Sequence, residues 1–82
     1  MPKLKIRNKL YSVIDCKDEL KPSKDGRPWV SEFYELKDKE GETRYMAIWS
    51  DDRFEIADEP MSARPEIEGM LPEIEEIKDG EI

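Results

Sequence analysis

The side chains best suited to binding lie near the C-terminal end of the sequence, where carboxylates alternate with large apolar residues. The carboxylates of this stretch are Glu66, Glu68, Glu73, Glu75 and Glu76, and the apolar residues among them are Ile67, Met70, Leu71, Ile74 and Ile77. Carboxylates spaced along a rigid surface can occupy a site built for phosphates, and a basic groove on a partner would supply steering and complementarity. A solubilising acidic tail is the alternative. Five large apolar groups favour the binding role, in which Met70, Leu71 and Ile74 supply apolar anchoring.

The sequence lacks the residues of the commonest catalytic and metal-binding arrangements. It contains no histidine and a single cysteine, Cys16. Ser/His and Cys/His nucleophile pairs, a structural zinc site and an internal disulfide are therefore excluded. Cys16 lies in an apolar strand pattern and is predicted to be a small core residue. We expect a protein that is not an enzyme and that has no metal site and no cofactor.

Charge and aromatic residues are distributed unevenly along the 82 residues. The chain carries 14 Lys and Arg against 21 Asp and Glu, a net charge of −7. Residues 1–56 hold all the aromatic residues and equal numbers of cations and acids, whereas residues 57–82 hold nine acids and two cations. This division predicts a small β domain over 1–56 and an acidic C-terminal segment over 57–82, either a docked helix or a flexible tail. Truncation at Asp58 is expected to leave the β domain folded.

Runs of β-branched and aromatic residues predict antiparallel strands in the first two thirds of the chain. The four predicted strands cover residues 10–16, 29–36, 43–49 and 53–56. The polar stretch 17–28 is predicted to be a loop, and residues 37–42, which include Gly41, are predicted to join two strands as a hairpin.

The predicted strands carry bulky apolar groups on both faces. With period-2 alternation, Tyr34 and Leu36 share one face of their strand while Phe33 lies on the other. A flat sheet would expose one face, so the sheet curls, or the C-terminal segment covers that face, or the face binds a partner. The expected fold class is mainly β with a little α, a small curled antiparallel sheet or partial barrel followed by an acidic segment with a short helix.

The short helix is predicted from Pro72 toward Gly80. Proline suits the first helical position and glycine suits the stop, and the acids between them complement the positive end of the helix dipole. Ile74 and Ile77 would share one face of this helix. Two turns are too few to be stable alone, so the helix would form only if these side chains dock.

The segment from Glu66 to Ile77 has the sequence Glu-Ile-Glu-Gly-Met-Leu-Pro-Glu-Ile-Glu-Glu-Ile. This segment resembles a stretch of the phage uracil-DNA glycosylase inhibitor family. That family has a Glu-Ser-Ile edge strand running into Met-Leu-Pro-Glu and an acidic helix. In the family the leading glutamate reaches into the enzyme's DNA-binding cleft, and the whole protein mimics DNA. The resemblance implies this role for Glu66 and a strand that ends at Met70 and Leu71. The resemblance covers residues 66–77 only, and Ile67-Glu68 stands here in place of the family's Ser-Ile. The segment lies near the C-terminus of this chain, whereas in the family it lies near the N-terminus.

These patterns leave two binding functions open. The first is a non-enzymatic acidic protein, in its sharpest form a DNA-mimic inhibitor of a nucleic-acid-processing enzyme such as uracil-DNA glycosylase. Its predicted partner-binding residues are Glu66, Glu68, Met70, Leu71, Glu73, Ile74, Glu75 and Glu76. The alternative is a small single-stranded-DNA-binding β-barrel with an acidic C-terminal tail. Aromatic residues close to cations, such as Trp29 and Arg27, suggest it, and residues 23–29 are similar to a turn that leads into a strand in small phage proteins of that kind.

The charge balance favours a protein partner over nucleic acid. Neutralisation of phosphates dominates affinity for nucleic acid, and residues 1–56 have no net charge. The expected partner is therefore a nucleic-acid-binding enzyme, with direct binding of nucleic acid less favoured. The longest apolar run is Met46–Trp49, so no membrane span is expected. We expect a cytoplasmic protein that belongs to a phage or a mobile element.

Overall fold

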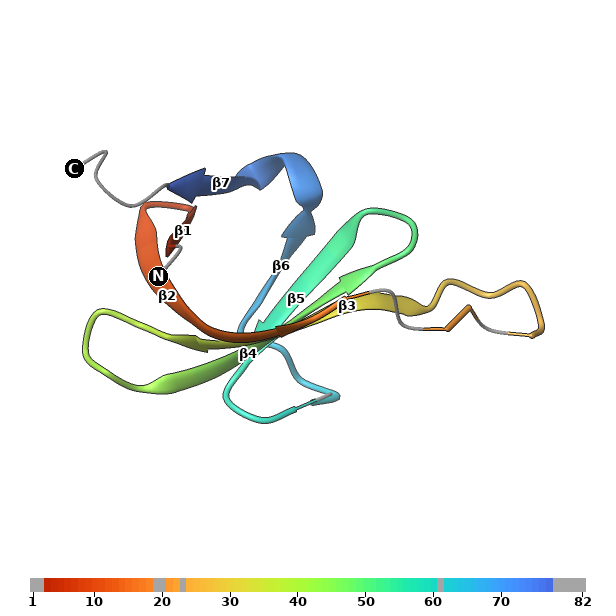
Figure 1. The fold of residues 1–82 in the computed structure, drawn as a ribbon, viewed down its shortest axis with the longest axis horizontal. Coiled ribbons are helices and arrows are strands. Elements are labelled where there is room, and N and C mark those ends of the chain that lie inside the picture. Colours follow the sequence, from red (N-terminus) through yellow and green to blue (C-terminus); the bar gives the residue numbers. More distant parts are fainter. Residues whose placement is uncertain (1–2, 19–20, 23, 61, 78–82) are drawn as a thin grey trace.

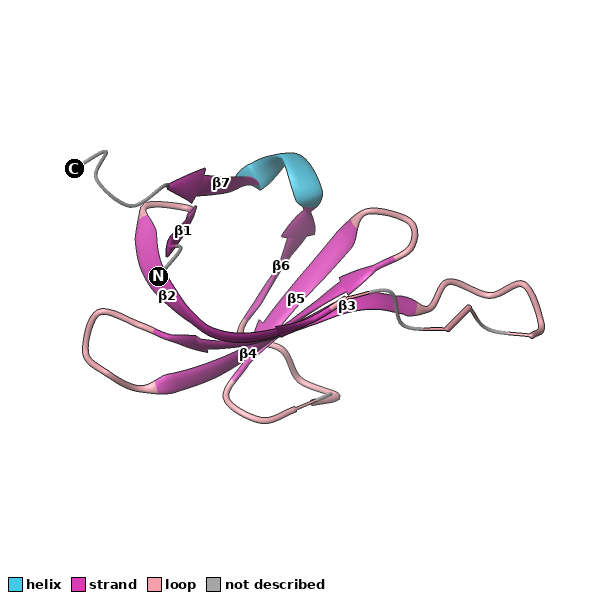
Figure 2. Cartoon of the chain, viewed as in Figure 1, coloured by secondary structure: helices cyan, strands magenta, loops and turns pink. Residues whose placement is uncertain are grey.

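The computed structural model of the protein describes residues 3–18, 21–22, 24–60 and 62–77. In this part of the chain there are seven strands and one turn of 3-10 helix (Figures 1 and 2). The elements are β1 (Lys3–Ile6), β2 (Lys9–Lys17), β3 (Val30–Lys37), β4 (Thr43–Trp49), β5 (Arg53–Ala57), β6 (Ile67–Met70), η1 (Leu71–Glu73) and β7 (Ile74–Ile77). The expected mainly β fold with a curled antiparallel sheet is confirmed.

The strands form one antiparallel sheet in the order β6-β5-β4-β3-β2-β1-β7. β6 and β7 are neighbours in the chain but lie at opposite edges of the sheet, joined by η1 alone. Strands lie about 4.8 Å apart, so a flat sheet of this size would hold its edges roughly 29 Å apart. Three residues of 3-10 helix rise only about 6 Å. The sheet must therefore curl until its edges approach, and Figure 1 shows β6, η1 and β7 arching across the open side of this half-barrel.

β1 is a strand that the sequence prediction did not include. Its residues alternate between cations and the buried Leu4 and Ile6. The connection to β2 consists of Arg7 and Asn8, which both have positive φ angles, 49° and 68°. Two central residues of this kind make a type I′ turn, whose twist matches that of paired strands. The short hairpin then brings β1 between β2 and β7.

The core fills the inside of the curl, on the surface that we call the inner face of the sheet. Its buried residues are Leu4, Ile6, Tyr11, Val13, Leu36, Met46, Ile48, Phe54 and Ile56, with Tyr34, Ile67 and Ile74 packed against them. Ile67 lies on β6 and Ile74 on β7, so the acidic segment contributes to the same core as residues 1–56. The sheet thus runs through both parts of the chain.

The opposite, outer face of the sheet is covered in part by the connection between β5 and β6. Phe33 and Tyr45 stack there with ring centroids 6.2 Å apart. Ser62 and Pro65 of the connection border the same small hollow as these rings. Curling and coverage by the C-terminal segment therefore both contribute to burying the two apolar faces.

Two sequence predictions are wrong. The helix predicted from Pro72 is a single turn, η1, followed by the strand β7; Gly80 lies outside the described residues. Ile74 pairs with Ile6 of β1 and packs on the core, and this pairing outweighs a two-turn helix that is unstable alone. Cys16 is exposed rather than buried, because β2 continues past the core and residues 14–17 are all exposed.

Candidate functional site

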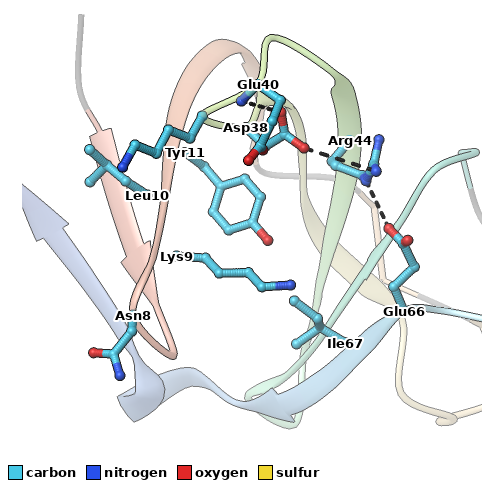
Figure 3. Close-up of a pocket in the computed structure, with 10 residues that line it drawn as sticks. Asn8, Lys9, Leu10, Tyr11, Asp38, Glu40, Arg44, Glu66 and Ile67 are labelled. Carbon is cyan, nitrogen blue, oxygen red and sulfur yellow. Dashed lines mark hydrogen bonds and ion pairs between the residues drawn. The ribbon is translucent and has the colours of Figure 1, made fainter.

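A pocket of about 390 Å³ opens between the β1–β2 turn, the β3–β4 connection and the start of β6 (Figure 3). Its walls are formed by residues 8–11, residues 38–40, Arg44 and residues 66–67. Segments far apart in the sequence meet here because the curl of the sheet brings β2 and β4 toward β6. A volume of this size is in the range of small-ligand sites.

Arg44 is the central charged group of the pocket. It lies opposite Leu36 in the β3–β4 ladder and therefore points to the inner face. Its Nε lies 2.8 Å from Oε1 of Glu66, and its Nη2 lies 3.9 Å from Oδ2 of Asp38. Asp38 is itself held in place, because its Oδ1 accepts hydrogen bonds from the backbone N–H groups of Glu40 and Glu42 at 3.0 and 2.8 Å. The β3–β4 connection, β4 and the start of β6 are thus linked by one set of charges.

The Tyr11 side chain forms the inner end of the pocket. The residue is only 4% exposed, and its ring belongs to the core. Figure 3 shows its hydroxyl pointing into the space between Lys9, Arg44 and Glu66. Among the described residues, no hydrogen bond to this hydroxyl is formed. Burial raises the pKa of Tyr11, and the nearby carboxylates of Asp38 and Glu66 raise it further against the opposing effect of Arg44, so the phenol stays protonated at neutral pH.

A second set of charges joins the two edges of the half-barrel. Arg7, in the β1–β2 turn, donates from Nη2 to the backbone carbonyl of Glu68 at 2.6 Å and from Nε to Oε2 of Glu73 at 3.1 Å. These bonds connect the turn to β6 and η1. Glu66 and Glu73, both predicted to contact a partner, are therefore already paired with arginines of the same chain.

The other residues predicted to bind a partner lie in three different places. Met70 and Leu71, at the junction of β6 and η1, are 48% and 36% exposed. Ile74 packs against the core and is not an exposed anchor. Glu75 and Glu76 are exposed on β7, opposite Lys5 and Leu4 of β1. The predicted site residues are therefore spread along the β6–η1–β7 arch rather than brought into one cluster.

Glu68 has a partner residue that the sequence analysis missed. It lies directly opposite Glu55 in the β5–β6 ladder. Both side chains point to the outer face, because they alternate with Phe54, Ile56 and Ile67, which face the core. No ion pair among the described residues involves either carboxylate. The alternation of residues 53–56 could have placed Glu55 on the outer face, but only the register with β6 shows that two acids face each other.

The aromatic residues are mostly occupied within the fold. Tyr11 and Phe54 are buried, and Phe33 stacks on Tyr45. The guanidinium carbon of Arg53 lies 5.4 Å from the centroid of the Trp49 ring, as in a cation–π contact. Few rings therefore remain free to stack on bases.

The described residues include no group of three or more cysteine or acidic side chains placed to hold a metal ion. They also include no helix long and apolar enough to cross a membrane. Comparison of the chain with protein-family models, with curated proteins and with solved structures finds no match.

Proposed function

We propose that the protein is a non-enzymatic acidic binding protein that docks on a basic surface of a protein partner. In its sharpest form it is a DNA-mimic inhibitor of a nucleic-acid-processing enzyme, such as uracil-DNA glycosylase, and it acts in the cytoplasm. The docking surface is the outer face around β6 and its junction with η1.

The observation that carries this proposal is the pair of facing acids, Glu55 and Glu68. Side chains directly opposite each other in an antiparallel pair lie about 5 Å apart at Cβ, and like charges there destabilise the sheet. No ion pair of the described residues compensates either acid. The free protein thus bears a local electrostatic cost that a cationic partner surface would remove. Closely spaced negative charges without a counter-ion from the same chain are what a surface needs in order to imitate the phosphates of DNA.

Apolar side chains beside these acids supply the second component of an interface. Met70 follows Glu68 on the same outer face of β6, and Leu71 continues the exposed surface into η1. Met70 also lies opposite Arg53, which contacts Trp49. Protein interfaces combine apolar and aromatic anchors with a charged rim, so this arrangement suits a protein partner better than a polyanion.

The test is surface plasmon resonance of the intact protein on immobilised uracil-DNA glycosylase, with a second DNA-binding enzyme beside it. The variant is Glu55→Gln with Glu68→Gln, and the matched control is Asp18→Asn with Glu42→Gln, which removes two exposed charges elsewhere. We expect the first pair to weaken binding about tenfold or more at roughly 0.15 M salt, since buried hydrogen-bonded charges contribute most to affinity. The control should change only the association rate, and by a small factor.

Equal weakening by both pairs would show a generic polyanion and contradict a defined docking face. Failure to bind the glycosylase, with binding to the second enzyme, would reject the named enzyme and keep the broader function. Failure to bind either enzyme, with capture of single-stranded DNA, would replace the proposal by the nucleic-acid-binding alternative.

A further inference from the structure

The pocket around Tyr11 contains a hydroxyl group that belongs to an otherwise buried side chain, opens into the pocket and has no partner among the described residues. Tyr11 is 4% exposed, its hydroxyl points into the pocket, and no hydrogen bond reaches it from another described residue (Figure 3). The ring is fixed by the core, so the hydroxyl is held in place at the inner end of the pocket. A fixed hydroxyl that faces a pocket and has no protein partner is a place where a ligand group can form a hydrogen bond.

The charges on the pocket wall favour a positively charged ligand. Asp38, Glu40 and Glu66 face Arg44, the one cation that lies partly buried in the wall, with a side chain 23% exposed. Each of these three carboxylates raises the pKa of Tyr11, whereas Arg44 alone lowers it, so the potential at the hydroxyl is negative. The net charge of −7 on the whole chain acts in the same direction on any ion that approaches.

Two lysines of the pocket do not reverse this preference, although the Lys9 side chain reaches under the Tyr11 ring (Figure 3). Lys9 and Lys39 line the pocket, but both residues are exposed. Their ammonium groups are carried on long flexible side chains, which can rotate toward the solvent at little cost in free energy. Asp38, in contrast, is fixed by two backbone hydrogen bonds and cannot leave.

We propose that this pocket receives an aliphatic cation, a guanidinium or ammonium group on a methylene stem, supplied by a basic side chain of a protein partner. Glu40 and Glu66 hold the charged end, the Tyr11 hydroxyl accepts a hydrogen bond from one of its N–H groups, and Ile67 contacts the stem. The existing pair between Arg44 and Glu66 shows that the wall already accommodates a guanidinium. The inference rests on the proposed function for the source of the cation.

The chemistry of the wall also distinguishes this ligand from a metal ion. No set of three or more acidic or cysteine side chains converges in the described part of the chain. The carboxylates are instead spread around a space of about 390 Å³ with apolar side chains between them. A cation with several N–H donors and an apolar stem matches such spacing better than a small ion that needs close oxygen ligands.

The test is an NMR titration of the intact protein with Nα-acetyl-arginine amide, followed at the methyl groups of Ile67 and at the Tyr11 ring. Nα-acetyl-citrulline amide, which has the same shape without the charge, is the matched ligand control. We expect saturable shifts with the arginine derivative and none with the citrulline derivative. Equal shifts with both would show a merely apolar pocket, and shifts with inorganic phosphate alone would show an anion site. Either result would overturn the inference.

Two variants locate the ligand within the pocket. Glu66→Gln should weaken binding of the arginine derivative about threefold or more, as expected for a half-exposed ion pair. Tyr11→Phe should weaken it about two- to tenfold, because it removes one hydrogen bond and little volume. Glu42→Gln, on the same connection but outside the pocket, should leave it unchanged. Thermal unfolding of each variant shows that the fold is retained. Unchanged affinity in both pocket variants would reject the site.

A last comparison identifies the source of the cation and separates this inference from the proposed function. A pentapeptide with capped ends, whose central arginine is its one charged residue, should bind at least as tightly as spermidine. Tighter binding of spermidine would show that the pocket binds a free polyamine, and it would contradict the proposal that a protein side chain is the ligand. Neither pocket variant alters Glu55 or Glu68. Enzyme binding that is insensitive to Glu66→Gln would therefore reject the pocket alone, and arginine binding without enzyme binding would reject the proposed function alone.

Discussion

Glu66 and Glu68 lie two residues apart in the sequence, yet their electrostatic surroundings are opposite. Glu66 precedes β6 and pairs at 2.8 Å with Arg44 inside the pocket, whereas Glu68 lies on the outer face opposite another acid, Glu55. The first carboxylate is compensated by the fold and helps to hold it together. The second is left uncompensated opposite another acid, an arrangement expected to destabilise the sheet. The acids of this protein therefore divide into a structural set, paired with arginines of the same chain, and an unpaired set, and only the unpaired set is fully available to a partner.

The largest expected effect concerns the segment that carries both acids. A chain that ends at Ala57 loses β6, η1 and β7, and with them Ile67 and Ile74, which pack on the core. Full burial of a large aliphatic side chain contributes about 1.5–3 kcal/mol, so even the partial burial of these two is a large part of a total stability of roughly 4–12 kcal/mol for a domain of this size. We expect this truncation to unfold the protein, contrary to what the sequence division at residue 57 suggested.

Circular dichroism and thermal unfolding measure this effect, and the exposed substitution Met70→Ala serves as a control that keeps the fold. A truncated chain with a native-like spectrum and a cooperative transition would show that residues 1–57 fold alone. The acidic segment would then not be needed for folding, and its paired acids could not be called structural.

A smaller effect is expected at Gly69, the residue after Glu68. A Cβ at this position would lie 2.8 Å from two carbons of the Phe54 ring and would also meet the carboxylate of Glu73. Phe54 is fully buried and cannot easily move. Gly69→Ala should therefore push β6 away from the core and disturb the bond between Arg7 and Glu73, at a cost of about 1–3 kcal/mol. Urea unfolding measures the loss, and a stability equal to that of the parent would contradict the close packing of β6.

Local alternation was sufficient to predict β2, β3, β4 and β5 nearly to the residue, because each of these strands pairs with the strand next to it in sequence. The β1–β7 pairing joins residues about seventy positions apart, and no local pattern indicates it. The Ile-Glu-Glu-Ile pattern of residues 74–77 is as compatible with a helix as with an edge strand. Only the presence of β1 as a partner decides between the two.

The candidate site was less predictable than the fold. Composition identified the acidic stretch, but which acids are neutralised depends on Arg7 and Arg44, which come from distant turns and strands. The pocket likewise follows from the curl of the sheet, which brings residues 8–11 and 66–67 together. Tyr11 could be recognised in advance as part of a strand, but the position of its hydroxyl depends on this closure.

Alkaline pH gives a further test of the charges around Tyr11. Burial and nearby acids raise the pKa of Tyr11 above its ordinary value of 10, and burial raises that of Tyr34 as well. The folded state then keeps these protons after the unfolded chain has lost them. The stabilising contribution is complete below about pH 10 and is lost as pH rises from 10 toward the folded pKa, by at most about 1.4 kcal/mol per pH unit for each group.

Urea unfolding at pH 9 and pH 11 measures this dependence. Tyr11→Phe should flatten it, and Arg44→Met should steepen it, because removal of the one opposing cation leaves the carboxylates unbalanced beside the hydroxyl. A Tyr11→Phe variant with the full alkaline loss would show that the pocket acids do not act on this side chain.

The smallest expected effects are the most direct test of the contrast between Glu66 and Glu68, because the same substitution should change stability in opposite directions. Glu68→Gln removes a repulsion from Glu55 and should stabilise the protein by a few tenths of a kcal/mol. Glu66→Gln weakens the bond to Arg44 and should destabilise it by about 0.2–1 kcal/mol, the small value expected because the Glu66 side chain is 49% exposed. Urea unfolding at low ionic strength resolves both signs, and salt of about 1 M should reduce both effects by screening.

Glu55→Gln should stabilise the protein as much as Glu68→Gln does, and the double variant should gain no more stability than either single one, since one removal already ends the repulsion. If Glu68→Gln and Glu66→Gln both destabilised the protein, Glu68 would also be a structural acid. That result would contradict the proposal that the outer face of β6 is the docking surface.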